Sequence, residues 1–218
     1  MGILQSIKCK WINEPIFVFQ TSNKLFQLSE IEKLKITCPP YIITNRIEDF
    51  IKFQNQHEFC IIKSLQSSFV QYGKKQFKFY TTDITEIEDS FIEGLTFSPI
   101  IVQKKILKRK EYRSTVVGNK CLTTSISYDG INEVTDVRNI IAAGNERLFK
   151  IDNNAVINKA SLKIASHFNL KYCGIDWIES KDGEVYFLEI NPLASFKWYE
   201  LSSNQDITMY IAKLLNEL

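Results

Sequence analysis

The 218-residue chain has few of the residues on which the commonest site chemistries depend. His57 and His167 are its only histidines and lie far apart, so a His-based triad or a His-ligated metal has little to draw on. Five cysteines form no CxxC pair, and this pattern fits reduced thiols in a cytosolic protein better than a disulfide or zinc framework. No apolar run approaches the ~18 residues needed to span a membrane, and no secretory signal is present. We therefore expect a cytoplasmic protein without a membrane contact.

The chain also lacks an excess of either charge. Lys and Arg number 27 against 25 Asp and Glu, and the formal net charge of +2 offers no electrostatic case for nucleic acid as a partner. Neither GxxxxGK[ST] nor GxGxxG occurs, which excludes a P-loop and a Rossmann nucleotide site. Hydrophobic residues make up 44% and charged residues 24%, as in an ordinary globular protein, so disordered and fibrous folds are excluded.

The apolar periodicity predicts an α+β fold. The expected helices are 25–34 with Ser22 as its cap, 47–56, one from Asp152 or Asn153 to 168, and 207–218. The expected strands are 41–44, 59–63, 100–106, 111–118, 121–127, 172–178 and 184–190. Residues 1–20 are short and mixed, and the character changes near residue 95. We expect one lobe over 21–95, and a second over 96–218 in which an antiparallel sheet is flanked by helices.

The most informative segments are the last two expected strands. Strand periodicity places Val185, Phe187, Glu189 and Asn191 on one face. Pairing the strands across the Lys181–Gly183 turn puts Asp176 opposite Glu189 to within a residue, with Cβ atoms about 5 Å apart, where unpaired like charges are destabilising. A divalent cation would resolve this conflict. Two carboxylates and an amide oxygen suit Mg²⁺ or Mn²⁺, and Mg²⁺ commonly takes its remaining ligands from nucleotide phosphates.

A simpler interpretation of these residues stays open. Glu189 and Asn191 are also typical of strand ends, and Asp176 could pair with a surface lysine. Two lysines are candidate phosphate ligands. Lys63 ends an apolar strand, Lys24 lies in the first turn of the first expected helix, and two such point charges can converge on one polyphosphate. Each lysine is equally explained by an apolar stem that carries its charge to water.

Six short motifs, in order along the chain, resemble the ATP-grasp superfamily, and more narrowly its RimK-like branch. They are Asn23-Lys24, Ile62-Lys63, Val102-Gln103-Lys104-Lys105-Ile106, Glu111-Tyr112-Arg113 with Val116-Val117-Gly118, Gly174-Ile175-Asp176, and Phe187-Leu188-Glu189-Ile190-Asn191-Pro192. Within that branch the chain resembles the microviridin-type (graspetide) maturases of ribosomal peptides. Three further features favour the maturases over RimK itself: Thr44-Asn45, Thr135-Asp136-Val137-Arg138 and Trp198.

The resemblance implies roles for eleven residues. Six would bind the nucleotide: Lys24 and Lys63 its phosphates, Gln103, Lys104 and Lys105 on the hinge strand its adenine, and Glu111 its ribose. Arg113 and Arg138 match basic residues near the triphosphate and the acceptor, in a catalytic role. Asp176, Glu189 and Asn191 match the metal ligands. This last assignment agrees with the pairing argument made from the residues alone.

The resemblance implies an ATP-grasp fold of two α+β lobes around a nucleotide, and an ATP- and Mg²⁺-dependent ligase. Such a ligase converts a peptide Asp or Glu carboxylate to an acyl phosphate, which a Ser or Thr hydroxyl or a Lys amine then attacks. The expected partner is a precursor peptide, together with either a second copy of the chain or a separate N-terminal domain. Residues 1–20 would then be a linker remnant after a missing N-terminal domain. Two other functions stay open: a RimK-like amino-acid ligase acting on a protein terminus, and a non-catalytic nucleotide-binding remnant.

One segment departs from the maturase pattern. The loop after Pro192 reads Leu193-Ala194-Ser195-Phe196, where the maturases usually have a turn that contains Gly-Gln. The resemblance therefore leaves the choice of peptide substrate open at this loop.

Overall fold

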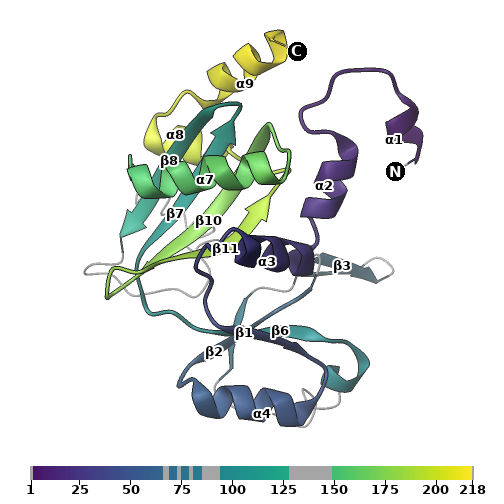
Figure 1. Cartoon of the computed structure of the whole chain (residues 1–218), viewed down its shortest axis with the longest axis vertical. Coiled ribbons are helices and arrows are strands. Elements are labelled where there is room, and N and C mark those ends of the chain that lie inside the picture. Colours follow the sequence, from purple (N-terminus) through teal and green to yellow (C-terminus); the bar gives the residue numbers. More distant parts are fainter. Residues whose placement is uncertain are drawn as a thin grey trace. The chain divides into compact units, whose positions relative to one another are not determined.

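The computed structural model describes residues 2–65, 69–72, 75–78, 81–84, 94–127 and 149–217. These residues form two compact units, each described by itself (Figure 1). The large unit comprises the described residues of 1–38, 108–132 and 141–218, and the small unit comprises those of 39–107. The domain boundaries that the sequence suggests, after residues 20 and 95, stay a prediction.

The large unit is built on a five-stranded sheet in which every pair of neighbours is antiparallel. Its strand order is β11-β10-β7-β8-β9. The strands are β7 (Lys108–Val117), β8 (Lys120–Ser127), β9 (Lys150–Ile151), β10 (Tyr172–Ser180) and β11 (Val185–Asn191). The helices are α1 (Gly2–Ser6), α2 (Pro15–Thr21), α3 (Lys24–Lys33), α7 (Ala155–His167), α8 (Lys197–Ser203) and α9 (Ile207–Asn216). The predicted α+β class and the antiparallel sheet flanked by helices are confirmed.

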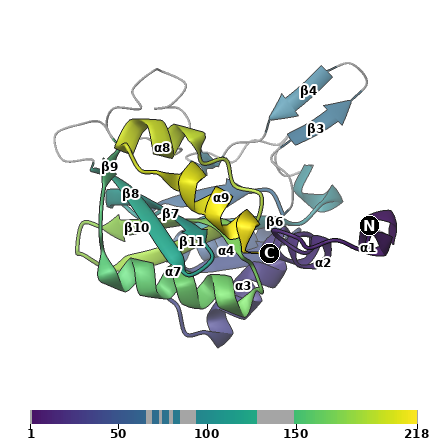
Figure 2. The same ribbon diagram turned by 90° about the horizontal axis from the view of Figure 1, so that it is seen from above.

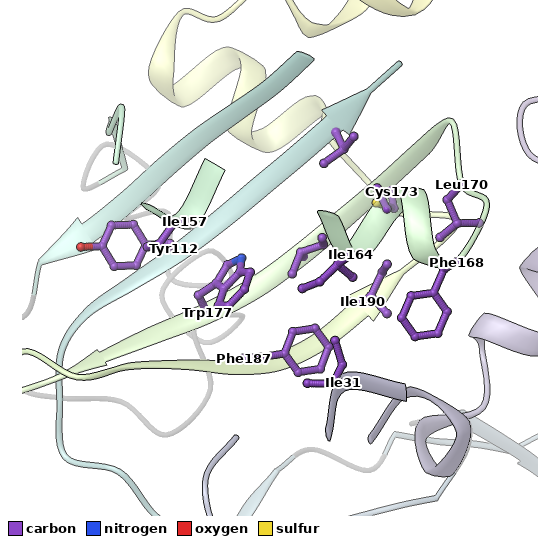
Figure 3. Close-up of a cluster of buried hydrophobic side chains, with 13 residues drawn as sticks. Ile31, Tyr112, Ile157, Ile164, Phe168, Leu170, Cys173, Trp177, Phe187 and Ile190 are labelled. Atoms are coloured by element: carbon purple, nitrogen blue, oxygen red, sulfur yellow. The ribbon is translucent and has the colours of Figure 1, made fainter. Parts of the chain in front are cut away.

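One face of this sheet packs its apolar side chains against α7 and α3. Trp177 and Phe187 from the sheet meet Ile157 and Ile164 of α7 and Ile31 of α3 in a single buried cluster (Figure 3). The Trp177 indole N–H donates to Ser161 Oγ at 3.1 Å, which satisfies the buried polar end of that ring. Helix α8 lies on the other face (Figure 2). That other face is therefore the one on which polar groups of the strands can gather.

A β-bulge in β11 corrects the predicted division of its residues between the two faces. Asp176 pairs with Glu189 but Trp177 pairs with Phe187, so Leu188 is an extra residue on β11. Phe187 and Ile190, three residues apart, both enter the apolar cluster. The prediction that Phe187 shares a face with Glu189 and Asn191 is therefore wrong, because strict alternation fails across a bulge. The predicted pairing of Asp176 with Glu189 is confirmed.

Asparagine side chains cap helices α3 and α7 of the large unit. Asn23 Oδ1 accepts from the N–H groups of Leu25 and Phe26, and Asn154 Oδ1 accepts from those of Val156 and Ile157. Each cap lies within one or two residues of the predicted one, Ser22 for the first helix and Asp152 or Asn153 for the second. In the last predicted helix, 207–218, Ile207 is buried while Leu215 is 57% exposed.

The small unit contains a second antiparallel sheet, with the strand order β1-β6-β2-β5. Its elements are β1 (Tyr41–Thr44), α4 (Ile47–Gln56), β2 (Cys60–Lys63), β5 (Thr82–Ile84) and β6 (Ile100–Lys104), with a separate hairpin of β3 (Phe69–Tyr72) and β4 (Lys75–Lys78). Phe50 and Phe53 of α4 pack on Val102 in its core. Strand β6 is thus a central strand of this sheet, bonded to β1 and β2.

In the part of the chain that the structure describes, no helix is both long enough and apolar enough to cross a membrane.

Candidate functional site

Three neighbouring strands of the large unit bring charged side chains together on one face of the sheet. Arg113 on β7 pairs in register with Asp176 on β10, and Asp176 pairs with Glu189 on β11. Asn191 follows Glu189 on the same strand, two residues later. Side chains directly opposite one another on neighbouring strands lie within reach of direct contact. The register alone therefore places a cation and two carboxylates in one row.

Hydrogen bonds join this row into a cluster. Arg113 Nη1 donates to both carboxylate oxygens of Asp176, at 2.8 Å each. Asn191 Nδ2 lies 3.0 Å from Glu189 Oε1 and 3.4 Å from Asp176 Oδ2. Lys24 Nζ lies 3.9 Å from Glu189 Oε2. Two positive groups thus offset two carboxylates that would otherwise repel each other. The alternative interpretation, in which Asp176 pairs with a surface lysine, is right that Asp176 has a basic partner, but this partner is Arg113.

Arg113 is enclosed on several sides. Its Cζ lies 5.1 Å from the centre of the Tyr199 ring, and its buried Nε has no hydrogen-bond partner among the described residues. A Cβ atom at Gly174 would come within 3.0 Å of Arg113 Cζ and Nη1, so only glycine leaves room for this guanidinium. Burial, the largest single cause, opposes the charge of Arg113, but Asp176, Tyr199, Glu189 and Tyr172 together outweigh it, and the pKa of Arg113 is raised. Arg113 is therefore a fixed positive charge beside Asp176.

Helix α3 is held against β11 by a buried glutamine. Gln27 Nε2 donates to Ile190 O at 2.8 Å, and Ile190 N donates to Gln27 Oε1 at 3.1 Å, as an adjacent strand would. The Gln27 amide also donates to Thr21 O. This pairing fixes α3 beside the strand that carries Glu189. Lys24, the first residue of α3, thereby comes close to the Glu189 carboxylate.

The segment before α2 belongs to the same unit. Asn13 is 5% exposed, and its amide makes four hydrogen bonds. Nδ2 donates to Tyr172 O and Pro192 O, while Oδ1 accepts from the N–H groups of Lys171 and Tyr172, all within 3.0 Å. Asn13 therefore joins the start of β10 to the end of β11. The sequence, which suggested a linker over 1–20, did not predict this role of Asn13, because a single asparagine forms no recognisable motif.

Tyr172 supports the loop that follows β11. Its hydroxyl donates to Ala194 O at 2.5 Å, in the loop that departs from the maturase pattern. Burial raises the pKa of Tyr172 to about 12, against the opposing effect of Arg113. The hydroxyl therefore stays protonated at neutral pH and remains a donor to this loop.

Glu111 lies two residues before Arg113 on β7. Its Oε2 is 3.0 Å from Lys108 Nζ, and the two side chains are only 14% and 6% exposed. A buried lysine needs such a partner, and the pair fixes the carboxylate of Glu111. The sequence did not indicate Lys108, because residues three apart in an alternating strand lie on opposite faces. The register irregularity between Lys108 and Lys110 breaks this alternation in β7.

The other predicted nucleotide contacts lie in the small unit. Gln103 is 2% exposed, and its Oε1 has no hydrogen-bond partner among the described residues. Lys104 N donates to Pro40 O and Lys105 N to Phe59 O. The Lys105 ammonium lies 3.0 Å from Asp83, and Lys63 ends β2 half-buried. Arg138 lies outside the described residues.

The fit of the site to a divalent cation rests on its oxygen donors. Two carboxylates reach the amide of one asparagine, and a half-turn of that amide would present its oxygen in place of its nitrogen. Among the described residues no group of three or more His, Cys, Asp or Glu side chains is arranged to hold a metal ion. The oxygen donors of Asp176, Glu189 and Asn191 are of the type that suits a hard cation with further ligands from phosphate or water, and their role as metal ligands stays a prediction.

A family model described as the RimK-like ATP-grasp domain matches residues 21–215, and the chain belongs to this family. Solved structures are also similar to this chain, among them the following two. A RiPP-associated ATP-grasp ligase of Chryseobacterium gregarium, in complex with ADP and a leader and core peptide, has a TM-score of 0.87 and 25% identity over 99% of this chain and 66% of its own. The macrocyclase MdnC of Microcystis aeruginosa MRC, bound with precursor peptide MdnA, has a TM-score of 0.80 and 25% identity over 100% of this chain and 67% of its own.

The chain spans only part of such relatives. An uncharacterized protein of Methanocaldococcus jannaschii, MJ0776, is 24% identical over 202 residues, which cover 91% of this chain and 48% of that protein. The chain therefore spans about half the length of this relative, and about two thirds of the C. gregarium ligase and of the macrocyclase MdnC. The predicted resemblance to RimK-like ATP-grasp proteins and their peptide-ligase members is confirmed.

Proposed function

We propose that the chain carries the nucleotide and metal site of an ATP- and Mg²⁺-dependent ligase that acts on a ribosomal precursor peptide. The ligase would phosphorylate an Asp or Glu side chain of the peptide, and a Ser or Thr hydroxyl or a Lys amine would displace the phosphate to close an ester or amide. The observation that carries this proposal is the joined cluster of Arg113, Asp176, Glu189 and Asn191, in a chain similar to two peptide ligases.

The residues of the large unit divide between metal and phosphate. Asp176, Glu189 and Asn191 would hold the Mg²⁺ ion through side-chain oxygens. When bound, that ion would neutralise the negative charge that develops on phosphate oxygens during transfer. Lys24 would neutralise a further phosphate oxygen. Its ammonium lies close to Glu189, and α3, which carries it, is bonded to β11. Positioning and charge neutralisation are the main contributions a protein makes to phosphoryl transfer.

Arg113 would serve the reacting groups. It keeps its proton, and one of its nitrogens already spans both oxygens of Asp176. A guanidinium held in this way is preorganised to stabilise negative charge on a transferred phosphoryl group or an acceptor carboxylate. Arg138 would assist in the same role.

The remaining contacts would serve the nucleoside. The buried Oε1 of Gln103, which has no hydrogen-bond partner among the described residues, is an acceptor suited to the adenine amino group. Lys104 and Lys105 would contribute partly through backbone groups, and Lys63 would contribute a charge for the phosphates. Glu111, fixed by Lys108, would accept from the ribose hydroxyls.

The test is ADP release by the purified chain with Mg²⁺, with and without a peptide encoded beside its gene that is rich in Thr, Ser, Glu and Asp. We expect peptide-dependent ADP release that Glu189→Gln abolishes. Glu184→Gln, an exposed site on the same hairpin, is the matched control and should keep full activity. The proposal fails if ADP release never depends on peptide, or if both variants behave alike.

A further inference from the structure

Tyr199 has no part in the roles assigned so far, yet it lies at the centre of the charged cluster. It is the third residue of α8 and is 7% exposed. Its ring centre lies 5.1 Å from Arg113 Cζ, and the charges of Asp176 and Glu111 act on its hydroxyl as well. Burial raises the pKa of Tyr199, so the ring stays neutral next to the guanidinium. A neutral aromatic face within 6 Å of a guanidinium attracts it.

Further contacts fix the Tyr199 ring and its helix, α8. Phe149 packs edge-on against Tyr199, with ring centres 5.3 Å apart and an angle of 81° between the planes. Glu200, the next residue, accepts from Thr208 N at 2.7 Å and from Thr208 Oγ1 at 2.8 Å, which fastens α8 to α9. Tyr199 is therefore fixed by its contact with Phe149 and by the attachment of α8 to α9.

Few other contacts fix the guanidinium of Arg113. Nη1 binds Asp176, and the Cα of Gly174 closes one side because no Cβ fits there. The Nε group has no hydrogen-bond partner in the described part of the chain, so this nitrogen does not set the tilt of the plane. The Tyr199 side chain contacts the guanidinium through its hydroxyl as well as its ring, and the ring is the flat surface that can set the tilt.

We propose that Tyr199 is a positioning residue that holds the Arg113 guanidinium against Asp176 in the geometry needed for phosphoryl transfer. The proposal rests on the proposed function for its catalytic consequence, and on the structure alone for the contact itself. A charge that is displaced by even a small distance stabilises the transition state less well. Loss of the ring should therefore lower kcat while the KM for ATP changes little.

Two variants separate the ring from the hydroxyl. Tyr199→Phe keeps the aromatic face, whereas Tyr199→Leu keeps an apolar side chain without it. Trp198→Leu, at a 49% exposed site on the same helix, is the matched control. We expect Tyr199→Leu to lower kcat about tenfold, which corresponds to about 1.4 kcal/mol, and the Phe and control variants to stay within about twofold.

A second readout does not need activity. With ¹⁵N-labelled arginine, the Nε–H resonance of Arg113 reports the ring above it, and Arg113→Lys assigns the signal. We expect that resonance to move in Tyr199→Leu and to stay in Tyr199→Phe, with both variants folded by circular dichroism. An unmoved resonance in the Leu variant overturns the proposal, as does an equal loss of kcat in the Phe variant. If the wild type shows no peptide-dependent turnover, the proposed function is refuted. The Arg113 resonance still decides whether Tyr199 holds Arg113.

Discussion

A methyl group added at Gly174 has no room beside Arg113. Its Cβ would lie 2.6 Å from Ala194 Cβ and 3.0 Å from both Arg113 Cζ and Nη1. The first distance is far below van der Waals contact, and it joins two backbone-attached atoms that cannot rotate away. Gly174→Ala must therefore shift β10 or the loop after β11, and must push the guanidinium from its place.

The magnitude follows from two opposed effects. Overpacking of a close-packed site costs about 1–3 kcal/mol. Replacing glycine by alanine also restricts the unfolded chain, which returns about 0.4–1 kcal/mol. We expect a net decrease in the free energy of unfolding of about 1–2 kcal/mol, or a fall in Tm of ~2–8 °C for a chain of this size.

Urea and thermal unfolding of four proteins measure this effect: the wild type, Gly174→Ala, Ala194→Gly and the double variant. The double variant removes the 2.6 Å contact but keeps the 3.0 Å contacts with Arg113. It should regain at least half of the lost stability and still turn over ATP slowly, because Arg113 remains displaced. The coupling free energy between neighbouring sites of this kind is usually about 0.5–3 kcal/mol.

Gly94→Ala is the control, since a Cβ there meets nothing within 4 Å among the described residues. The reasoning is refuted if Gly174→Ala is as stable as Gly94→Ala. It is also refuted if Ala194→Gly restores no stability in the double variant.

Three further predictions concern the supports of the site. Asn13→Ala should lower the free energy of unfolding by about 2–3 kcal/mol in urea unfolding, because buried backbone groups of β10 lose their partners; an effect below about 0.5 kcal/mol would contradict this. Gln27→Leu should weaken ATP binding in calorimetry more than it lowers Tm, because α3 carries Lys24; unchanged affinity would speak against it. Burial raises the pKa of Tyr172 from 10.0 to about 12, so its contribution is complete below pH 10 and is lost as the pH rises towards 12; Tyr172→Phe should flatten the fall in stability across that range, and an unchanged slope would exclude this cause.

Much of the large unit was predictable because its signals are local. The starts of α3 and α7 to within one or two residues, and the Asp176–Glu189 pairing, follow from short-range spacing and a turn of known length. The bulge at Leu188 was not predictable, since the extra residue leaves no mark on an alternating strand. Its effect was to exchange faces for Phe187 without moving Glu189.

The supports of the site were missed for a different reason. Asn13, Gln27 and Tyr199 act on residues that lie far from them in the chain, and each is an ordinary residue in its own segment. Arg113 itself came from the resemblance and not from the spacing. Only its pairing with Asp176 shows what its charge offsets, and this pairing joins β7 to β10, between which β8, β9 and α7 lie in the chain.

The most direct test of the central claim is the intact mass of the precursor peptide after incubation with the chain, ATP and Mg²⁺. We predict the loss of one water per bond formed, with one ADP released for each, and neither change with Glu189→Gln. Addition of an amino acid to the peptide would instead indicate a RimK-like ligase. An unchanged peptide mass, with ATP bound but not consumed, would contradict the account.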